Sequence, residues 1–321
     1  MAKLANKTSS STSDKVVFVL NPKSASGATR RKFERLRGRY QAAFPQMEVQ
    51  LTNAQGHATE LATAALKKGV ETIVVVGGDG TINEVANGFF DDEGNAYSQK
   101  AALGVLTSGT GGDFRKTFGW SLDEKESLAR LKRREVSSVD VGRMWCTNDD
   151  GEKVHRLWVN IASFGLSGAV DEEVQKSGKS LGGKAAFFFA TTRAMVGHKK
   201  SRVRLTQDDN APVEKDLTLL ALGNGQFFGG GMWIAPEADI RDGFLDVIDF
   251  GAAGPRFWLT KGLSIYKGKH LGLAEVKSGR CQRLLAEPVN EDIIKIDLDG
   301  ELPGHLPAEF SVMPRALQLI V

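Results

Sequence analysis

The first third of the chain alternates short runs of apolar residues with stretches of helical periodicity. The runs expected to form strands are Lys15–Pro22, Met47–Thr52, Thr72–Val76 and Ala101–Thr107, and the stretches expected to form helices include Thr29–Phe44 and His57–Gly69. Strands that are separated by helices are joined by right-handed crossovers and lie parallel in one sheet. This alternation therefore predicts an α/β domain at the N-terminus.

The pattern changes near Glu135, where strand-like segments begin to dominate. They include His155–Phe164 and Asp216–Gly225, and short turns rich in Gly, Asp and Asn join them. Helical stretches interrupt them near Ser167–Val196 and Phe257–Lys267. We therefore predict an α/β domain at residues 15–134, joined by the C-terminal segment 312–321, an antiparallel β-domain at 135–311, and a disordered polar tail at 1–14.

The composition narrows the classes of protein. A net charge of +3 over 321 residues is too small to argue for nucleic-acid binding. Cys146 and Cys281 lie far apart without metal-binding spacing, so we expect buried free thiols in a reducing cytosol. There is no signal-peptide pattern, and the most apolar helical candidate, Lys184–Val196, falls short of the ~20 residues that a membrane span requires. We expect a soluble cytoplasmic protein.

The junction VVVGGDGTINEVANGF, from Val74 to Phe89, is the most informative segment of the α/β region. Thr81 with Glu84 three residues later predicts a capping box at the start of a helix. The turn Gly77–Gly80 would then lie between the carboxyl end of a buried strand and a helix N-terminus. In open α/β sheets ligands bind there, and free N–H groups with the helix dipole favour phosphate.

Asp79 is the unusual residue of this turn. The chain has neither the GxxxxGK[ST] of a Walker A loop nor a GxGxxG fingerprint at this point. A carboxylate beside phosphate is repelled unless a cation bridges the two, and Mg²⁺ binds through one or two carboxylates plus phosphates. Asp79 therefore predicts a nucleotide–magnesium site, and the alternative is an aspartate that caps a helix.

A second group of acids follows near the C-terminus, in IKIDLDGEL from Ile294 to Leu302. Strand alternation places Lys295, Asp297 and Asp299 on one side. Acids side by side repel near a site, and a cation or a shared proton would offset this. The alternative is an exposed acidic hairpin.

Three motifs in this order resemble those of the diacylglycerol kinase catalytic-domain family: NPKSASG (Asn21–Gly27), GGDGTINEV (Gly77–Val85) and SGTGGDFRKT (Ser108–Thr117). That family includes bacterial diacylglycerol kinases, related lipid kinases, and sphingosine and ceramide kinases; GGDGT alone is shared with NAD kinases and phosphofructokinases. The resemblance covers most of the chain from about Lys15. It implies a Rossmann-like nucleotide-binding domain followed by an antiparallel β-sandwich that binds lipid, with ATP in the cleft between them.

The resemblance also implies which residues surround the nucleotide: Asn21, Thr52, Gly77, Gly78, Asp79, Gly80, Thr81, Asn83, Glu84 and Thr110. For Thr52 the alternative is a cap at a strand end. The third motif departs from the family, because many bacterial members carry an asparagine before the aspartate where this chain has Gly112 before Asp113. Asp113 is expected either to cap the following helix or to serve as a site carboxylate.

Catalytic roles follow from the Asp-Gly-Glu motif at Asp299–Glu301. In the family this motif is implied to supply the general base, and motif position ranks Glu301 slightly above Asp299, with Asp79 as the third catalytic candidate. A further block, APEADIRDGFLDV (Ala235–Val247), resembles one that holds a structural Mg²⁺. Its implied ligands are the side chain of Asp242 and backbone carbonyls near Asp239 and Phe244, and the alternative is an ordinary β-turn.

The sequence thus predicts an ATP- and Mg²⁺-dependent lipid kinase that acts on diacylglycerol, or on a sphingoid or ceramide-type lipid. The alternatives are a kinase of a soluble acceptor, as NAD kinase is, and a nucleotide-binding protein without turnover. The expected partner is a lipid at a membrane surface, and the oligomeric state is left open. The basic stretches Thr29–Arg39 and Arg130–Arg134 are candidates for peripheral contact with the inner membrane face, with a solvated helix face as the alternative. Phe227, Phe228 and Trp233 are candidates for the acceptor pocket or for the core.

Overall fold

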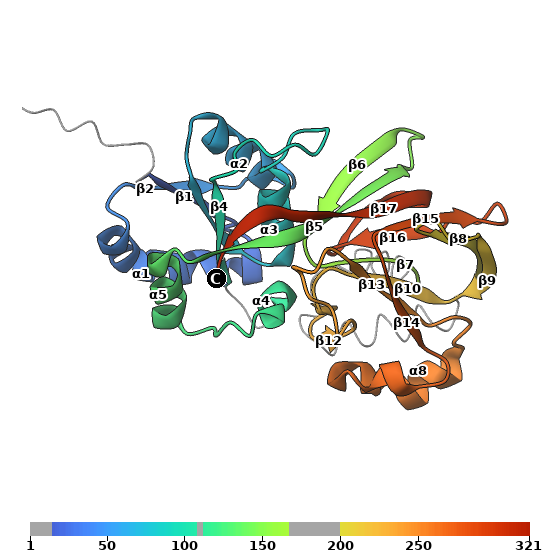
Figure 1. The fold of residues 1–321 in the computed structure, drawn as a ribbon. Helices are drawn as coiled ribbons and strands as arrows, with labels where there is room; N and C mark the ends of the chain where they lie inside the picture. The colour runs from blue at the N-terminus through green and yellow to red at the C-terminus, as the bar shows by residue number, and fades with distance from the viewer. Residues whose placement is uncertain (1–14, 108–111, 167–199) are drawn as a thin grey trace, which may run out of the picture.

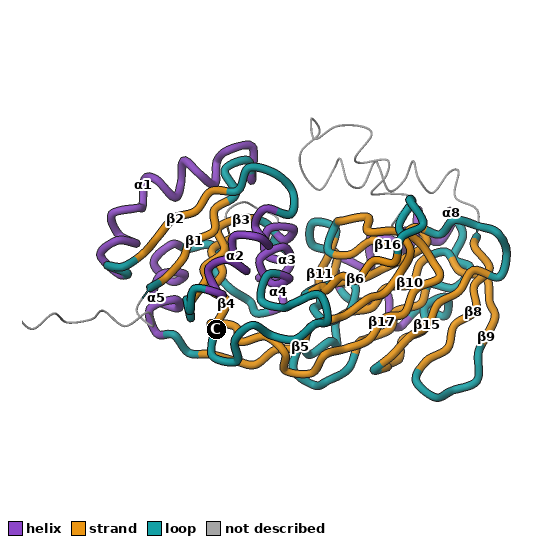
Figure 2. Tube along the Cα trace, turned by 90° about the horizontal axis from the view of Figure 1, so that it is seen from above, coloured by secondary structure: helices purple, strands orange, loops and turns teal. Residues whose placement is uncertain are grey.

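The computed structural model describes residues 15–107, 112–166 and 200–321. The predicted tail at 1–14, the nucleotide candidate Thr110 and the helical stretches within Ser167–Val196 lie outside these ranges. A helix-rich N-terminal part and a strand-rich C-terminal part are distinct in Figure 2. The predicted fold class, an α/β unit followed by an antiparallel β-rich unit, is confirmed.

The N-terminal sheet is parallel and has the order β2-β1-β3-β4. Its strands are β1 (Val16–Leu20), β2 (Met47–Leu51), β3 (Thr72–Gly77) and β4 (Ala102–Thr107). Its helices are α1 (Ala28–Ala43), α2 (His57–Lys67), α3 (Asp79–Asn87), α4 (Asp113–Thr117) and α5 (Glu124–Arg133), and a short 3₁₀ segment, η2 (Ser24–Gly27), precedes α1.

Helices cover both faces of this sheet because its strands are apolar on both. Phe18 of β1 points to a cluster with Phe33 of α1 and Leu131 of α5. Val17 and Val19 point the other way, to a cluster formed with α2 and α3. The chain runs from β1 to β2 on one side of β1 and continues with β3 on its other side. The strand order therefore reverses between the carboxyl ends of β1 and β3. In doubly wound sheets this is the point at which ligands bind.

The C-terminal part is antiparallel. Its strands are β5 (Val136–Thr147), β6 (Lys153–Trp158), β7 (Ile161–Gly165), β8 (Ser201–Gln207), β9 (Val213–Leu217), β10 (Leu219–Gly223), β11 (Phe227–Phe228), β12 (Met232–Trp233), β13 (Leu245–Asp249), β14 (Lys277–Cys281), β15 (Arg283–Pro288), β16 (Lys295–Leu298) and β17 (Glu301–Ile320). A helical segment, α8 (Pro255–Lys261) with η3 (Gly262–Lys267) and η4 (Lys269–Gly272), connects β13 to β14. Residues of β10 alternate between two cores, with Leu220 in the strand-lined core and Leu219 in the one that α8 covers.

The long strand β17 joins the two parts (Figure 1). It pairs antiparallel with β16, β15 and β5, and its last residues pair parallel with β4 through Gln318 and Leu319. The chain therefore ends inside the N-terminal sheet. The two parts are consequently connected by a continuous hydrogen-bonded sheet as well as by the chain.

Two local expectations are wrong. Helix α3 begins at Asp79 with Gly78 as its N-cap, so Thr81 lies inside the helix and no capping box forms. The Glu84 carboxylate instead accepts the backbone N–H of Ala58 at 3.2 Å, in the first turn of α2. The N-cap lies three residues earlier than predicted because the chain already leaves β3 at Gly78, whose backbone is extended.

The segments expected as single strands each divide into two. His155–Phe164 breaks between β6 and β7 at Val159 and Asn160, and Asp216–Gly225 breaks at Thr218 between β9 and β10. In both places the backbone N–H groups bond outside the ladder: Thr218 donates to the carbonyl of Gly251, and Val159 donates to a carboxylate described below.

Both cysteines are buried free thiols, as expected. Among the described helices, none combines the length and apolar character that crossing a bilayer requires.

Candidate functional site

Four carboxylates meet in a cavity of about 170 Å³ between the two parts of the molecule. Asp79 and Asp113 come from the N-terminal part, and Asp297 and Asp299 come from the β16–β17 hairpin. The remaining lining residues are Asn160, Ile161, Phe228, Gly229 and Gly300. The cavity thus adjoins the reversal point of the parallel sheet.

The predicted phosphate corner lies on the N-terminal wall. Asn21, just after β1, donates its backbone N–H to Val76 at 3.0 Å and its side-chain amide to the Thr81 hydroxyl at 3.0 Å. A Cβ on Gly77 would lie 2.7 Å from the Thr81 Cβ, so only glycine fits at that point. Because the first N–H groups of α3 have no partner within the helix, this corner presents donors suited to phosphate.

Asp79 connects this corner to the next helix. Its Oδ2 accepts the backbone N–H of Asp113 at 2.8 Å and its Oδ1 accepts that of Phe114 at 3.0 Å. The capping alternative therefore applies, although the helix that Asp79 caps is α4 and not its own. Burial raises the pKa of Asp79, and the neighbouring charge of Asp113 raises it further against these hydrogen bonds.

Asp299 is held by backbone N–H groups at the break between β6 and β7. Its Oδ2 accepts the N–H groups of Val159 at 2.9 Å and Asn160 at 3.3 Å, and its Oδ1 accepts that of Ile161 at 2.8 Å. Positive φ angles at Asp299 (50°) and Gly300 (89°) make the tight hairpin turn that directs the carboxylate inward. Burial raises the pKa of Asp299 to about 7, with the charges of Asp79 and Asp297 adding to this and the bonds from Val159 and Ile161 opposing it.

The other two acids are also fixed. Asp297 accepts the N–H of Gly300 at 2.8 Å and the hydroxyl of Ser163 at 3.3 Å. Asp113 forms an ion pair with Lys116 and accepts the N–H of Gly230 at 2.7 Å, a contact between the two parts of the molecule. Four acids beside one paired lysine, Lys116, make the surroundings of the cavity acidic.

Magnesium fits this donor set. Among the described residues, no three acidic, histidine or cysteine side chains converge closely enough to hold a metal by themselves. Mg²⁺ does not require this, since it is commonly bound by one or two carboxylates together with phosphates and water. Asp79, at the predicted nucleotide corner, is the residue that would hold it together with the phosphates.

Three further candidates, Glu301, Thr52 and Asn83, are not part of the cavity lining. Glu301 faces Glu84 and Gln55; burial raises its pKa, with the charge of Glu84 adding to the effect and the hydrogen bond from Gln55 opposing it. Thr52 is buried and donates its N–H to Leu20 at 2.9 Å, continuing the β1–β2 pairing. Asn83 is buried inside α3, where its carbonyl and side chain accept from the Asn87 amide.

Comparisons with known proteins agree with this geometry. The model of the diacylglycerol kinase catalytic domain matches residues 15–144, and that of the YegS C-terminal NAD kinase beta sandwich-like domain matches residues 160–321. A protein of Xanthomonas oryzae pv. oryzae named "Probable lipid kinase YegS-like" is 30% identical over 94% of each chain. This chain belongs to the diacylglycerol kinase catalytic-domain family.

Other members of the diacylglycerol kinase family are also similar over most of their length. The diacylglycerol kinase of Mycobacterium tuberculosis (strain ATCC 25618 / H37Rv) is 27% identical over 85% of this chain and 84% of its own. A crystal structure from Bacillus anthracis str. Sterne superposes with a TM-score of 0.73 at 26% identity, covering 96% of this chain and 97% of that one. Yeast NADH kinase, at 10% identity and a TM-score of 0.50, shares the fold alone.

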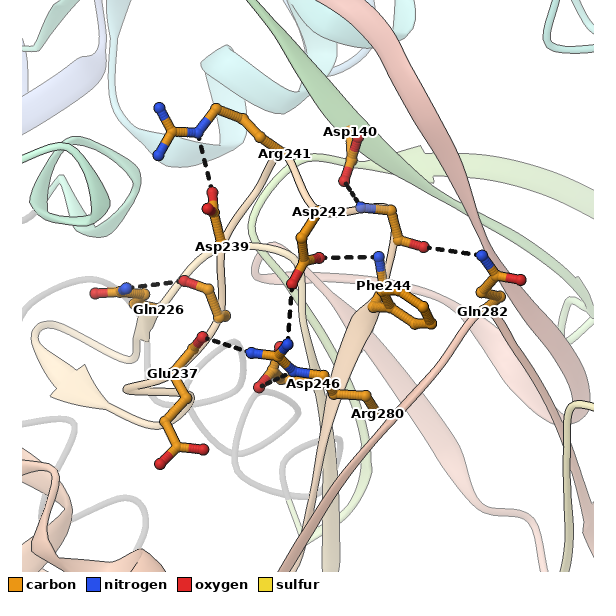
Figure 3. A network of polar contacts seen from close by, with 12 residues as sticks. Asp140, Gln226, Glu237, Asp239, Arg241, Asp242, Phe244, Asp246, Arg280 and Gln282 are labelled. Atoms are coloured by element: carbon orange, nitrogen blue, oxygen red, sulfur yellow. Dashed lines mark hydrogen bonds and ion pairs between the residues drawn. The ribbon is translucent and has the colours of Figure 1, made fainter.

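In this diacylglycerol kinase family member, the side chains around the predicted structural magnesium ligands are already engaged with one another (Figure 3). Asp239 pairs with Arg241 at 3.0 Å, and Asp242 accepts the N–H of Phe244 at 3.0 Å. The other oxygen of Asp242 lies 3.3 Å from Nη1 of Arg280.

Arg280 supplies the positive charge at this place. Its Nε lies 3.6 Å from Oδ1 of the buried Asp246, and its Nη2 donates to the carbonyl of Glu237 at 3.2 Å. The Asp242 carboxylate, the predicted side-chain ligand of a structural Mg²⁺, is therefore paired with a guanidinium, and the backbone-carbonyl ligands near Asp239 and Phe244 stay a prediction. Burial raises the pKa of Asp246 to about 6, and Arg280 partly opposes this.

Sequence reasoning missed Asn160 and Lys116. Asn160 donates its side-chain amide to the carbonyl of Phe227 at 2.5 Å and so fixes the hairpin that carries Phe228 into the cavity. The available signal was a polar residue inside the apolar run LWVNIASF. Lys116 carried no signal, because its role depends on how α4 docks against β11.

Proposed function

We propose that this protein is an ATP-dependent kinase that transfers the γ-phosphate of ATP to the hydroxyl group of a lipid such as diacylglycerol. The observation that carries the proposal is the cavity in which Asp79, from a phosphate-type corner, faces Asp299, from the Asp-Gly-Glu hairpin. Phosphoryl transfer needs fixed phosphates, charge neutralisation and a base at the acceptor. The wall with Asp79 would fix the phosphates, and the wall with Asp299 would supply the base.

The N-terminal wall would bind the nucleotide. The α3 N-terminus and the Asn21–Thr81 pair support phosphate binding at the end of β3. Thr52, which follows β2, would contact the adenosine side, and Thr110 remains a candidate on the third motif. Magnesium, when bound with the triphosphate, neutralises the charge that four carboxylates would otherwise set against it.

Asp299 is the better candidate for the general base. It lines the cavity, its Oδ1 accepts a single backbone N–H, that of Ile161, and so keeps a lone pair, and a pKa of about 7 suits a base that works near neutral pH. Asp299 would take the proton of the lipid hydroxyl as that oxygen attacks the γ-phosphorus, while the bond from phosphorus to the β–γ bridging oxygen breaks and ADP leaves. Glu301 does not line the cavity, so it would influence Asp299 or the acceptor only from a neighbouring position.

The acceptor is proposed from two considerations. The similar proteins named above are a diacylglycerol kinase and a lipid kinase. In addition, Phe228 and Ile161 give the cavity an apolar side next to its acids, which suits a hydroxyl carried on an apolar body. A sphingoid or ceramide-type acceptor offers the same chemistry and is separated by assay.

The test is transfer of labelled phosphate from ATP to diacylglycerol, sphingosine, ceramide and NAD, with and without Mg²⁺. We expect a labelled lipid in the presence of Mg²⁺ and a loss of about 10²-fold or more in Asp299→Asn. Asp292→Asn, an exposed acid near β16, is the matched control and should retain the wild-type rate.

Labelled NADP without labelled lipid would reject the lipid acceptor in favour of a soluble one. ATP binding without transfer to any acceptor would reject the kinase altogether. Glu301→Gln separates the two base candidates, because a larger loss there than in Asp299→Asn would assign the base to Glu301.

A further inference from the structure

The segment between β13 and β14 presents an outward stripe of basic and apolar side chains. Helix α8 runs directly into η3, and Phe257, Trp258 and Ile265 face the core against Phe250. The opposite side carries the stripe that we call the α8–η3 face, which consists of Arg256, Leu259, Thr260, Leu263 and Lys267. Their spacing of three and four residues places them on one side of a helical segment.

The two leucines of this face are unusually exposed. Leu259 has 78% of its surface accessible and Leu263 has 65%. They stand four residues apart, so their side chains are neighbours and form one apolar contact area. Single exposed leucines are common on protein surfaces. Two neighbouring leucines that are flanked by cations are typical of a helix that lies in a membrane interface.

The charge around these leucines has one sign. Residues 251–274 contain no Asp or Glu, and they carry Arg256, Lys261, Lys267 and Lys269. Only Lys261 has an ion-pair partner among the described residues, Glu275, at 2.6 Å. The other three cations are exposed and available to a negatively charged partner.

The segment that carries this face reaches the wall of the cavity through residues outside the face. Trp233 of β12 packs against Gly268, where a Cβ would lie 3.0 Å from its ring, and stacks on Phe227 of β11 with ring centroids 5.5 Å apart. The next residue, Phe228, lines the cavity. Tyr266, three residues after Leu263, lies near enough to Asp113 that the Asp113 charge adds to burial in raising the pKa of the tyrosine.

We propose that the α8–η3 face docks on the surface of an anionic phospholipid bilayer, with Leu259 and Leu263 inserted among the acyl chains and Arg256, Lys267 and Lys269 against the headgroups. The inference rests on the proposed function and names the surface through which the enzyme reaches its lipid. Complementary charge selects a bilayer over a second copy of this chain, because a like-charged copy of the face would be repelled.

The experiment is flotation of the full-length protein with vesicles of phosphatidylcholine alone and of phosphatidylcholine mixed with phosphatidylglycerol. We expect binding to the mixed vesicles that weakens with salt. Leu259→Ser/Leu263→Ser should lower the partition coefficient about tenfold or more, and Arg256→Gln/Lys267→Gln should lower binding to the mixed vesicles only.

Two controls isolate the face. Val213→Ser/Ile293→Ser removes two exposed apolar residues elsewhere in the C-terminal part and should bind as the wild type does. Arg31→Gln/Arg39→Gln removes two exposed cations of α1, which is a separate basic surface. A loss of binding in the α1 variant without a loss in the leucine variant would overturn the inference, as would wild-type protein that floats with neither vesicle.

Kinase activity is measured separately, on a short-chain diacylglycerol that stays monomeric in water. The leucine variant should phosphorylate it at the wild-type rate and lose rate only on vesicles. If no variant and no wild-type protein phosphorylates any lipid, the proposed function fails while the flotation result stands by itself; equal rates on vesicles for the leucine variant and the wild type would refute the docking surface alone.

Discussion

Asp299 is subject to opposed forces that place its pKa near neutrality. Three backbone N–H groups stabilise the carboxylate, while burial and the neighbouring charges of Asp79 and Asp297 disfavour it. An ordinary solvent-exposed aspartate is ionised throughout the physiological range, whereas this one changes charge within it. The same residue therefore links catalysis and stability to pH.

A pH dependence of stability follows from this raised pKa. Between about pH 5 and 7 the native Asp299 retains a proton that the unfolded chain has already released, so its contribution makes the free energy of unfolding fall as pH rises, by at most about 1.4 kcal/mol per pH unit. Chemical denaturation at several pH values should show a shallower fall in Asp299→Asn than in wild type. Identical slopes in the two proteins would mean that Asp299 titrates normally.

Arg280 should make the Asp242 cluster independent of metal. In the absence of nucleotide, a chelator should leave the thermal midpoint of the wild-type protein unchanged, because the guanidinium already neutralises Asp242 and Asp246. Arg280→Ala should lower the midpoint, since a buried acid loses its partner, and added Mg²⁺ or Mn²⁺ should recover more stability in this variant than it adds to wild type.

The matched control for this experiment is Arg283→Ala, which removes an exposed ion pair with Glu309 one strand away. The stability that divalent ions add to this variant should equal the stability that they add to the wild type, in which we expect them to bind only in the cavity between the two parts. A wild-type midpoint that drops on chelation would show a bound structural cation and refute the role given to Arg280.

At the scale of elements, the strand–helix corner is linked to α4 through one carboxylate. Asp79 starts α3 and caps α4, so it fixes two helix N-termini that point into the same cavity. Helix α4 in turn contacts β11, where the Thr117 hydroxyl accepts the N–H of Gln226 at 3.0 Å. A disturbance at Asp79 is therefore expected to reach the C-terminal wall.

Substitutions of Asp79 should separate its structural and chemical roles. Asp79→Ala removes the cap and should cost on the order of 1 kcal/mol of stability, whereas Asp79→Asn keeps one acceptor and should cost less. Both variants lose the carboxylate and should lose transfer activity by about 10²-fold or more. Denaturation midpoints and phosphorylation rates measured on the same samples decide this, and an Asp79→Asn enzyme with full activity would remove the metal argument.

At the scale of the whole molecule, the cavity exists only because β5 and β17 run through both parts. These two strands pair from Val136 with Ile320 to Thr147 with His305, which holds the Asp-Gly-Glu hairpin opposite the nucleotide corner. Any movement that closes the two parts over the cavity must therefore bend the hydrogen-bonded pair of strands β5 and β17. A motion of this kind is smaller than one about a flexible linker.

Nucleotide binding should accordingly stabilise both parts together. At a free MgATP concentration of 100 times its Kd we expect about 2.7 kcal/mol of stabilisation, in one unfolding transition and not in a separate N-terminal one. Differential scanning calorimetry with and without MgATP measures this. A shift confined to part of the transition would show that the C-terminal wall makes no contact with the bound nucleotide.

Much of the candidate site was accessible from the sequence because its residues stand next to strong local signals. Asn21, Gly77 and Asp79 follow buried strands, and Asp299 with Gly300 forms a two-residue turn of a recognised type. The predicted capping box of Thr81 and Glu84 is wrong, because it is a local pattern, whereas the helix begins at Asp79 and Glu84 accepts an N–H at the N-terminus of another helix.

The sequence by itself determined the alternation of strands and helices, the change to antiparallel strands, and the acids and glycines at the ends of particular strands, because periodicity and turn chemistry act over a few residues. The tertiary structure alone decided that Asp79 caps α4, that Asp299 bonds the break at Val159–Ile161, and that Arg280 pairs with Asp242. These pairings join residues 34 to 140 positions apart in the sequence. No local preference encodes such contacts, since their free energy is gained only when the sheet has closed and water has left the groups between its walls.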